Sequence, residues 1–202
     1  MSERPVVAAF DFDGTITYRD TLLPFLWFVT TPWAFCFQLL QCVPTFIGYV
    51  MGIVSRQTTK EQVLTQFLAG EQLATIRKKA EAFSLERLNR HVRPEALRRL
   101  QWHKNQGHRT VLISANLDVY LQPWGKVSGF DDVISSELQE DEKGRFTGRL
   151  KGKNCWGEQK TARLEKLLGP KKDYELYAYG DSLGDKQLLS IADHAFFRKM
   201  PI

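Results

Sequence analysis

Hydrophobic residues in this chain gather in short runs that end abruptly in polar residues. Three of these runs are apolar and partly β-branched: Val6 to Phe10, Thr110 to Ile113 and Glu175 to Tyr179. Runs of this length and composition are typical of strands that are buried on both faces of a parallel sheet. Each run is followed by small or acidic residues, in the segments "DFDGT", "SANLD" and "GDSLGD".

Two segments between these runs carry helix signals. Pro94 to Gln106 has a proline in its first turn and a following Gly107, and Trp156 to Leu168 is followed by Gly169 and Pro170. Strands that alternate with helices predict an α/β fold, a Rossmann-like doubly wound parallel sheet. Ligands bind beyond the carboxyl ends of such strands, so one pocket is expected to collect the three polar segments.

Residues 18–91 interrupt the alternation, because they contain no run typical of a parallel strand. Thr58 and Glu61 fit a capping box before an amphipathic helix, and Ala74 to His91 is typical of a second, charged helix. We therefore expect a small helical cap inserted after the first strand. The expected domains are a core domain of residues 1–17 and 92–202 and a cap domain of residues 18–91. In the core, Asp131 to Leu150 predicts a short strand and a peripheral hairpin.

The segment from Thr21 to Ser55 contains no charged residue and no histidine. Pro24, Pro32 and Pro44 divide it, which predicts two or three short helices rather than one membrane span of about 20 residues. Two interpretations stay open. The helices form the apolar core of the cap, or they contact a bilayer surface or line a groove for a lipid chain. The basic helices that follow suit an anionic membrane, although basic faces are often simply solvated.

The charge and the cysteine content indicate which partners and which cellular location to expect. The net charge of +5 favours anionic partners such as phosphorylated molecules or acidic lipids. We expect no nucleic-acid partner, because no known binding module is recognised. The three cysteines fit neither a zinc site nor a disulfide framework. With no secretion signal near the start, this predicts a cytoplasmic protein, peripheral at the inner face of the membrane if it contacts lipid. The sequence leaves the oligomeric state open.

Aspartates dominate the chemistry at the expected strand ends. Asp11 and Asp13 follow the first strand, and Asp181 and Asp185 follow the third. Four carboxylates at one sheet edge predict a site for a hard cation, with Mg²⁺ as the expected cofactor. One aspartate is also a candidate nucleophile for a phosphoryl group, while another manages the proton of the leaving oxygen.

Other residues at these ends suit a phosphate group. Gly14 allows the backbone to turn sharply and to present amide groups to phosphate oxygens. Ser114 offers a hydroxyl group, and Lys160, near the start of a helix, offers a cation for the phosphoryl charge. Taken singly, Ser114 is more typical of a turn residue and Lys160 of a surface lysine.

In this order, "DFDGT", Ser114, Lys160 and "GDSLGD" resemble the four motifs of the haloacid dehalogenase superfamily of phosphohydrolases. The helical insertion after the first motif resembles subfamily IB, which includes phosphoserine phosphatase. The stretch "GKNCWGEQKTARLEKLL" further resembles a bacterial branch that includes phosphatidylglycerophosphatase C-like proteins.

The resemblance implies a Mg²⁺-dependent phosphomonoesterase that works through an aspartyl-phosphate. It implies that Asp11 is the nucleophile and a metal ligand. It implies that Asp13 is the general acid/base and a metal ligand through its backbone carbonyl. It further implies that Ser114 and Lys160 contact the phosphate. It implies that Asp181 is a second metal-binding carboxylate and that Asp185 holds the waters bound to the metal.

Substrate-binding residues are less defined. Gly184 stands where phosphoserine phosphatase-like members carry Asn, which disfavours amino-acid substrates. Asp20 lies where small-molecule members place an acid that contacts a substrate amine, and a helix N-cap is the alternative. Ala115 and Asn116 are further candidates, with a helix cap as the alternative for Asn116. The expected substrate is a phospholipid or another small phosphorylated metabolite, and the alternative to an enzyme is a non-catalytic membrane-associated or scaffold protein on the same core.

The remaining polar and aromatic residues are assigned to structure. His91, His103, His108 and His194 have no metal-ligand spacing and are expected at the surface or its boundary. Tyr179 and Trp156 are expected in the core.

Overall fold

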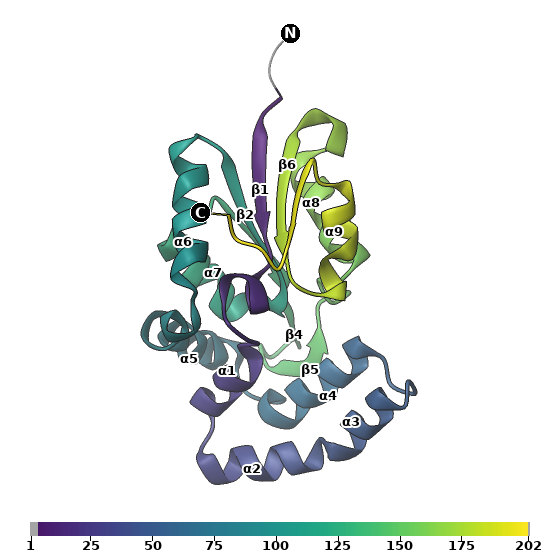
Figure 1. The fold of residues 1–202 in the computed structure, drawn as a ribbon. Helices are drawn as coiled ribbons and strands as arrows, with labels where there is room; N and C mark the ends of the chain where they lie inside the picture. Colours follow the sequence, from purple (N-terminus) through teal and green to yellow (C-terminus); the bar gives the residue numbers. More distant parts are fainter. Residues whose placement is uncertain (1–3, 202) are drawn as a thin grey trace.

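A parallel five-stranded sheet forms the centre of the molecule in the computed structural model, which describes residues 4–201. Its strand order is β3-β2-β1-β6-β7, so β1 is central (Figure 1). The strands are β1 (Val6–Phe10), β2 (Arg109–Leu117), β3 (Asp132–Ser136), β6 (Glu175–Gly180) and β7 (His194–Phe197). The predicted α/β fold with a Rossmann-like doubly wound parallel sheet is confirmed, and β2 continues beyond the predicted end at Ile113.

Strand β1 shows why this sequence forms a buried central strand. Alternate side chains point to opposite faces of a strand. Ala8 and Phe10 therefore enter the core on one face of the sheet, and Val7 and Ala9 enter the core on the other. Both faces are apolar, so the strand fits only where helices cover the sheet on both sides.

Four helices provide that cover. Helices α6 (Pro94–Asn105) and α7 (Asp118–Ser128) pack in the core on the face of Phe10. Helices α8 (Glu158–Leu168) and α9 (Lys186–Ile191) pack on the opposite face. The predicted helix from Trp156 begins two residues later, at Glu158, after Gly157 with a positive φ.

Residues 18–91 form helices at one end of the sheet (Figure 1). They are α1 (Leu22–Val29), α2 (Pro32–Gln41), α3 (Val43–Val50), α4 (Arg56–Leu68) and α5 (Leu73–Glu86), followed by a short 3₁₀ turn, η2 (Leu88–His91). The prolines predicted two or three short helices between Thr21 and Ser55, and three are present, α1 to α3. The predicted capping box is wrong, because Ser55 is the N-cap of α4 and its side chain accepts from the Thr58 amide at 3.1 Å.

The two connections between these helices and the sheet lie side by side. Thr17 and Val92 form an isolated antiparallel bridge. The Tyr18 amide donates to the His91 carbonyl at 2.9 Å, and the Arg93 amide donates to the Ile16 carbonyl at 2.8 Å. Paired backbone at this point fixes where the helices begin relative to the strand ends.

The hairpin of β4 (Leu138–Glu140) and β5 (Phe146–Leu150) is not the peripheral ribbon that the sequence suggested. Its apolar side chains alternate along the strands, and Leu138, Phe146 and Leu150 are buried. The backbone of Phe146 exchanges hydrogen bonds with residues 70 and 71, between α4 and α5. The hairpin therefore ties the cap helices to the sheet, and β3 belongs to the main sheet.

No single helix within residues 4–201 is long and apolar enough to cross a membrane. Helices α2 and α3 together reach the required length and composition, but the pair is bent by 43°.

Candidate active site

Asp11 stands at the carboxyl end of β1, where the chain enters a tight turn, η1 (Phe12–Ile16). The turn requires Gly14, whose φ is +81°. A Cβ atom at this position would also lie 2.3 Å from Asp181 Oδ2. The turn thus brings the end of β1 against the end of β6.

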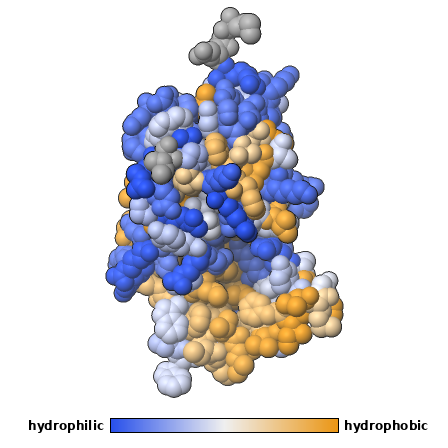
Figure 2. All heavy atoms as spheres, viewed as in Figure 1, coloured by the Kyte–Doolittle hydropathy of each residue, from blue (hydrophilic) through white to orange (hydrophobic). Residues whose placement is uncertain are grey.

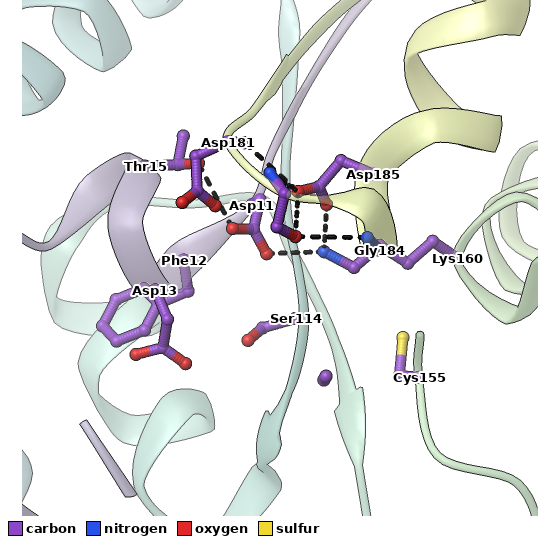
Figure 3. A network of polar contacts seen from close by, with 12 residues as sticks. Asp11, Phe12, Asp13, Thr15, Ser114, Cys155, Lys160, Asp181, Gly184 and Asp185 are labelled. Carbon is purple, nitrogen blue, oxygen red and sulfur yellow. Dashed lines mark hydrogen bonds and ion pairs between the residues drawn. The ribbon is translucent and has the colours of Figure 1, made fainter. Parts of the chain in front are cut away.

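A buried lysine joins two of the predicted aspartates (Figure 3). Lys160 Nζ lies 2.5 Å from Asp11 Oδ1 and 2.6 Å from Asp185 Oδ1. Burial acts to lower the pKa of Lys160, but the two carboxylates outweigh it and raise that pKa above its ordinary value. Lys160 is therefore held as a cation at the strand ends.

Burial and the neighbouring Asp185 raise the pKa of Asp11 to about 6, against the lowering effect of Lys160. The second oxygen of Asp11, Oδ2, accepts from the Thr15 hydroxyl at 3.2 Å. Asp185 is fixed in turn, because its Oδ2 accepts from the Ser182 hydroxyl at 2.9 Å and from the amides of Asp181 and Ser182.

Asp11, Asp181 and Asp185 each offer a carboxylate oxygen, and these atoms lie within 4.8 Å of one another. Oxygen ligands of this kind are the ones that Mg²⁺ prefers. When ionised, three carboxylates and the Lys160 ammonium leave two negative charges, which one divalent cation balances. The donor set therefore fits Mg²⁺.

The structure does not bring the Asp13 carboxylate into this cluster. Asp13 Oδ1 accepts from the amide and hydroxyl of Thr21 at 2.9 and 2.8 Å, and Oδ2 accepts from the Asn116 side-chain amide at 2.8 Å. These bonds turn the carboxylate away from Lys160 (Figure 3). Burial, with the charges of Asp20 and Asp11, raises the pKa of Asp13 to about 7.

The predicted residues that follow the second strand lie in the same region, although β2 itself extends through them. Ser114 is buried, and its hydroxyl accepts from the Asn116 amide at 3.0 Å. Asn116 bonds Asp13 through its side chain, and its own oxygen accepts from the Leu117 amide, which precedes α7. Asn116 thus orients an active-site carboxylate and also bonds backbone at the start of the next helix.

A hollow of about 280 Å³ opens beside Asp13, between the strand ends and the cap helices. Ala115 and Asn116 line it from β2, and Asp20 lines it from the segment before α1. Asp20 is exposed, and its Oδ1 accepts from the Leu22 amide at 2.8 Å. The predicted N-cap alternative for Asp20 is wrong, because Thr21 is the N-cap of α1 and Asp20 precedes it. Asp20 lines the hollow.

Sequence reasoning missed two basic residues of this hollow, Arg56 and Lys60 of helix α4. Lys60 donates to the Ala115 carbonyl and, at 3.3 Å, to Asn154 Oδ1. Burial lowers the pKa of Lys60 to about 8, against the raising effect of Asp13 and Asp20. No motif links α4 to the strand ends, so only the tertiary structure reveals this contact.

Two structural assignments need correction. His103 is completely buried rather than at the surface, and its Nε2 lies 2.8 Å from the Tyr179 hydroxyl. Its inward position follows from the spacing Ala96, Leu100, His103, which places these residues on one helix face. Trp156 is not in the core, because it is exposed and stacks beneath the Arg56 guanidinium. Tyr179 is buried, as predicted.

The haloacid dehalogenase-like hydrolase family matches residues 8–190. The chain therefore belongs to this family of hydrolases. It is 34% identical to Protein CicA of Caulobacter vibrioides over 200 residues, which is 98% of this chain and 88% of that protein.

Solved structures share the fold. A Bordetella pertussis protein of unknown function has a TM-score of 0.77 at 22% identity and covers 94% of this chain and 87% of its own. A phosphoserine phosphatase solved as a phospho-aspartyl intermediate analogue has a TM-score of 0.58 at 16% identity, with 94% and 84% covered. The chain thus has the fold of phosphoserine phosphatase-like members of its family.

Proposed function

We propose that this protein is a Mg²⁺-dependent phosphomonoesterase that forms an aspartyl-phosphate on Asp11. The observation that carries the proposal is the Lys160 ammonium held between Asp11 and Asp185 at the carboxyl ends of β1 and β6. A cation fixed beside a buried carboxylate is suited to a phosphoryl group that approaches that carboxylate. The family membership and the phospho-aspartyl analogue of a structural relative support the same chemistry.

Asp11, Asp181 and Asp185, with the backbone carbonyl of Asp13, would hold the metal. Bound Mg²⁺ would offset the charge of the phosphoryl oxygens and reduce their repulsion of the attacking carboxylate. Ser114 and Lys160 would bind the phosphoryl oxygens. Gly14 would allow the amides of its turn to contact the same oxygens.

In the first step, a carboxylate oxygen of Asp11 bonds to phosphorus and the ester P–O bond breaks. The leaving oxygen takes its proton from Asp13, whose raised pKa of about 7 keeps a proton available near neutrality. In the second step, water attacks phosphorus and gives a proton to Asp13. The bond to Asp11 then breaks, and inorganic phosphate leaves with Asp11 restored.

The hollow beside Asp13 is where the rest of the substrate would lie. Its apolar wall includes Leu22, Leu23, Phe46, Tyr49 and Ala115, whereas Asp20, Arg56, Lys60 and Asn116 supply its polar groups. This mixture suits a phosphomonoester with both apolar and polar parts. The proposed substrate is a phospholipid or another small phosphorylated metabolite, and the proposed location is the cytoplasm, including the inner face of the membrane.

The test is release of inorganic phosphate from a substrate panel, with Mg²⁺ and with a chelator. The panel pairs phosphatidylglycerophosphate and phosphatidic acid with phosphoserine, phosphocholine, sugar phosphates and nucleotides. Asp11→Asn is the inactive variant, and Asp193→Asn, which lies in a surface ion pair, is the matched control. We expect Mg²⁺-dependent release that is lost in Asp11→Asn and kept in Asp193→Asn.

A covalent readout separates the mechanism from mere binding. Rapidly quenched native protein should gain the mass of one phosphoryl group on the peptide that contains Asp11. Turnover without that adduct, or turnover that survives Asp11→Asn, would contradict the proposed nucleophile. Equal turnover in Mg²⁺ and chelator would contradict the proposed metal.

A further inference from the structure

The outer surface of α2 and α3 is apolar. Figure 2 shows hydrophobic residues gathered at the end of the molecule formed by these helices, whereas the sheet end is mostly hydrophilic. Neither α2 nor α3 contains a fully buried residue. Large exposed apolar patches on a folded protein mark contact sites.

The exposed residues follow helical periodicity. On α2, Trp33, Phe37 and Leu40 are spaced by four and three residues, and all are exposed. This spacing brings side chains back to one face of a helix. Trp33 is 88% exposed, so this face has no cover within the described chain.

Helix α3 repeats the pattern. Val43, Ile47 and Val50 are again spaced by four and three residues and exposed, and Val50 is 84% exposed. The inward side chains Phe35, Leu39 and Phe46 are also apolar and pack against the core. The two helices are therefore apolar on the protein side and on the solvent side, a composition typical of helices with non-aqueous surroundings on both sides.

A basic hollow lies next to this apolar face. Arg19, Arg87 and Arg90 line it together with Trp27 and other apolar side chains of α1. None of the three guanidinium groups makes an ion pair or side-chain hydrogen bond with another residue of the described chain. The charges of Arg19 and Arg90 also help burial to lower the pKa of His91, which places positive potential inside the hollow. Asp20 is the one acidic group among its described lining residues.

We infer that α1–α3 dock the protein on an anionic lipid membrane, with the Trp33–Val50 face in the interface and the arginine hollow on lipid phosphates. Charge complementarity favours a membrane as the partner of this face. Unpaired guanidinium groups beside an uncharged apolar stripe match a bilayer surface, in which anionic headgroups lie above apolar acyl chains. A second copy of the chain would bring the same positive charges together.

The helices lie along the membrane plane rather than across it. At 1.5 Å per residue, α2 and α3 span about 15 and 12 Å, whereas the hydrocarbon core is about 30 Å thick. The bend of 43° between them also suits a curved contact with a surface. Phe46 and Tyr49 of α3 also line the hollow beside Asp13, so docking sets that hollow close to the interface.

The test is co-sedimentation of the full chain with two kinds of vesicle, without substrate or metal. One kind is phosphatidylcholine alone, and the other is phosphatidylcholine mixed with phosphatidylglycerol. We expect binding to the anionic vesicles, with affinity that falls as salt is added. This measurement does not depend on catalysis, so failure of the proposed phosphatase activity would leave it intact.

Variants locate the contact. Trp33→Glu with Val50→Glu should weaken vesicle binding at least tenfold, because both side chains leave the apolar layer. The matched control is Val127→Glu, a change at an exposed valine of α7. Arg87→Ala with Arg90→Ala should weaken binding to anionic vesicles roughly tenfold, and Arg98→Ala on α6 is its control. All four proteins should keep native hydrolysis of p-nitrophenyl phosphate and native circular dichroism.

Three results would overturn the inference. The first is absence of binding to anionic vesicles at low salt. The second is equal loss of binding in the Val127→Glu control. The third is a native dimer in analytical ultracentrifugation that Trp33→Glu with Val50→Glu converts to a monomer without any effect on vesicle binding, which would assign the face to a second copy of the chain.

Discussion

Lys160 and Asp185 form a buried ion pair across the site, with Nζ and Oδ1 2.6 Å apart. The pair joins the first turn of α8 to the turn η4 (Leu183–Asp185) that follows β6. Lys160 is thereby fixed in place before any phosphate arrives. Its second partner is Asp11, so the same ammonium orients the proposed nucleophile.

Removal of the Lys160 ammonium should lower the free energy of unfolding far more than removal of a surface ammonium. Lys160→Met leaves two buried carboxylates without their cation, and we expect a loss of about 3–5 kcal/mol in the free energy of unfolding. Lys171→Met breaks a pair of the same length, 2.6 Å to Asp193, but a partly exposed one. That control should lose about 1 kcal/mol or less. Urea unfolding in chelator measures both, and equal losses would contradict the structural role assigned to Lys160.

Gly14 should be required for phosphate release as well as for the local backbone conformation. Gly14→Ala forces a side chain into a φ of +81° and into Asp181, whereas Gly107→Ala meets a similar φ of +73° with nothing within 4 Å. The backbone conformation should cost each variant about 1–2 kcal/mol. Only Gly14→Ala should also lose phosphate release, by at least tenfold in kcat/KM. Similar activity in the two variants would show that the contact with Asp181 is unimportant.

Magnesium should stabilise the fold through the three clustered carboxylates. Ligand that binds only the native state adds about 2.7 kcal/mol at 100 times its Kd. Thermal unfolding with increasing MgCl₂ should therefore raise the Tm of the native chain. Asp181→Asn removes one ligand and should abolish most of the rise, whereas Asp20→Asn, outside the cluster, should keep it. A rise that Asp181→Asn leaves unchanged would place the metal elsewhere.

His103 should make stability depend on pH below neutrality. Burial, with the nearby charges of Arg99 and His108, lowers its pKa from 6.5 to about 3. The unfolded chain therefore takes up the proton first as the pH falls. The stabilisation is complete above pH 6.5 and is lost toward pH 3, at about 1.4 kcal/mol per pH unit.

Replacement of His103 by a non-titrating residue isolates this effect. His103→Gln retains a polar partner for the Tyr179 hydroxyl but takes up no proton in this range. Urea unfolding between pH 4 and pH 7 should show a steeper fall for the native chain than for the variant. Parallel curves would mean that His103 is not held neutral in the folded state.

The central sheet could be predicted because its inner strands are apolar on both faces. The short strand predicted within Asp131 to Leu150 is the edge strand β3, whereas the other edge strand, β7, was missed. The residues of β7 alternate between partly buried and exposed positions, and His194 to Phe197 is only four residues long. Short half-polar runs of this kind do not differ enough from loops to be recognised. The prolines of Thr21 to Ser55 predicted short helices, but the sequence could not show which of their faces would remain uncovered.

Some residues of the candidate site could also be predicted from the sequence, and others could not. Asp11, Ser114 and Asp181 were predictable because each lies at or near the end of a run that predicts a strand. Lys60 was not, since its place in the site depends on how α4 meets the end of β2, and the two residues in contact, Lys60 and Ala115, are 55 positions apart in sequence. The orientation of the Asp13 carboxylate was not predictable either. It depends on the segment of Asp13 itself and on the two segments that contain Thr21 and Asn116.

The central place of β1 bears on how the chain acquires its activity during synthesis. Its five residues precede every other strand of the sheet in the chain, yet their pairing partners are Arg109 to Leu112 on one side and Glu175 to Tyr179 on the other. Contacts so distant in sequence form slowly, because a long loop must close before they contribute. The ribosome therefore releases this apolar strand well before either of its neighbours in the sheet has been synthesised. A chain truncated before β6 would carry the DFDGT motif without the strand that flanks Asp11 or the aspartates that complete its cluster.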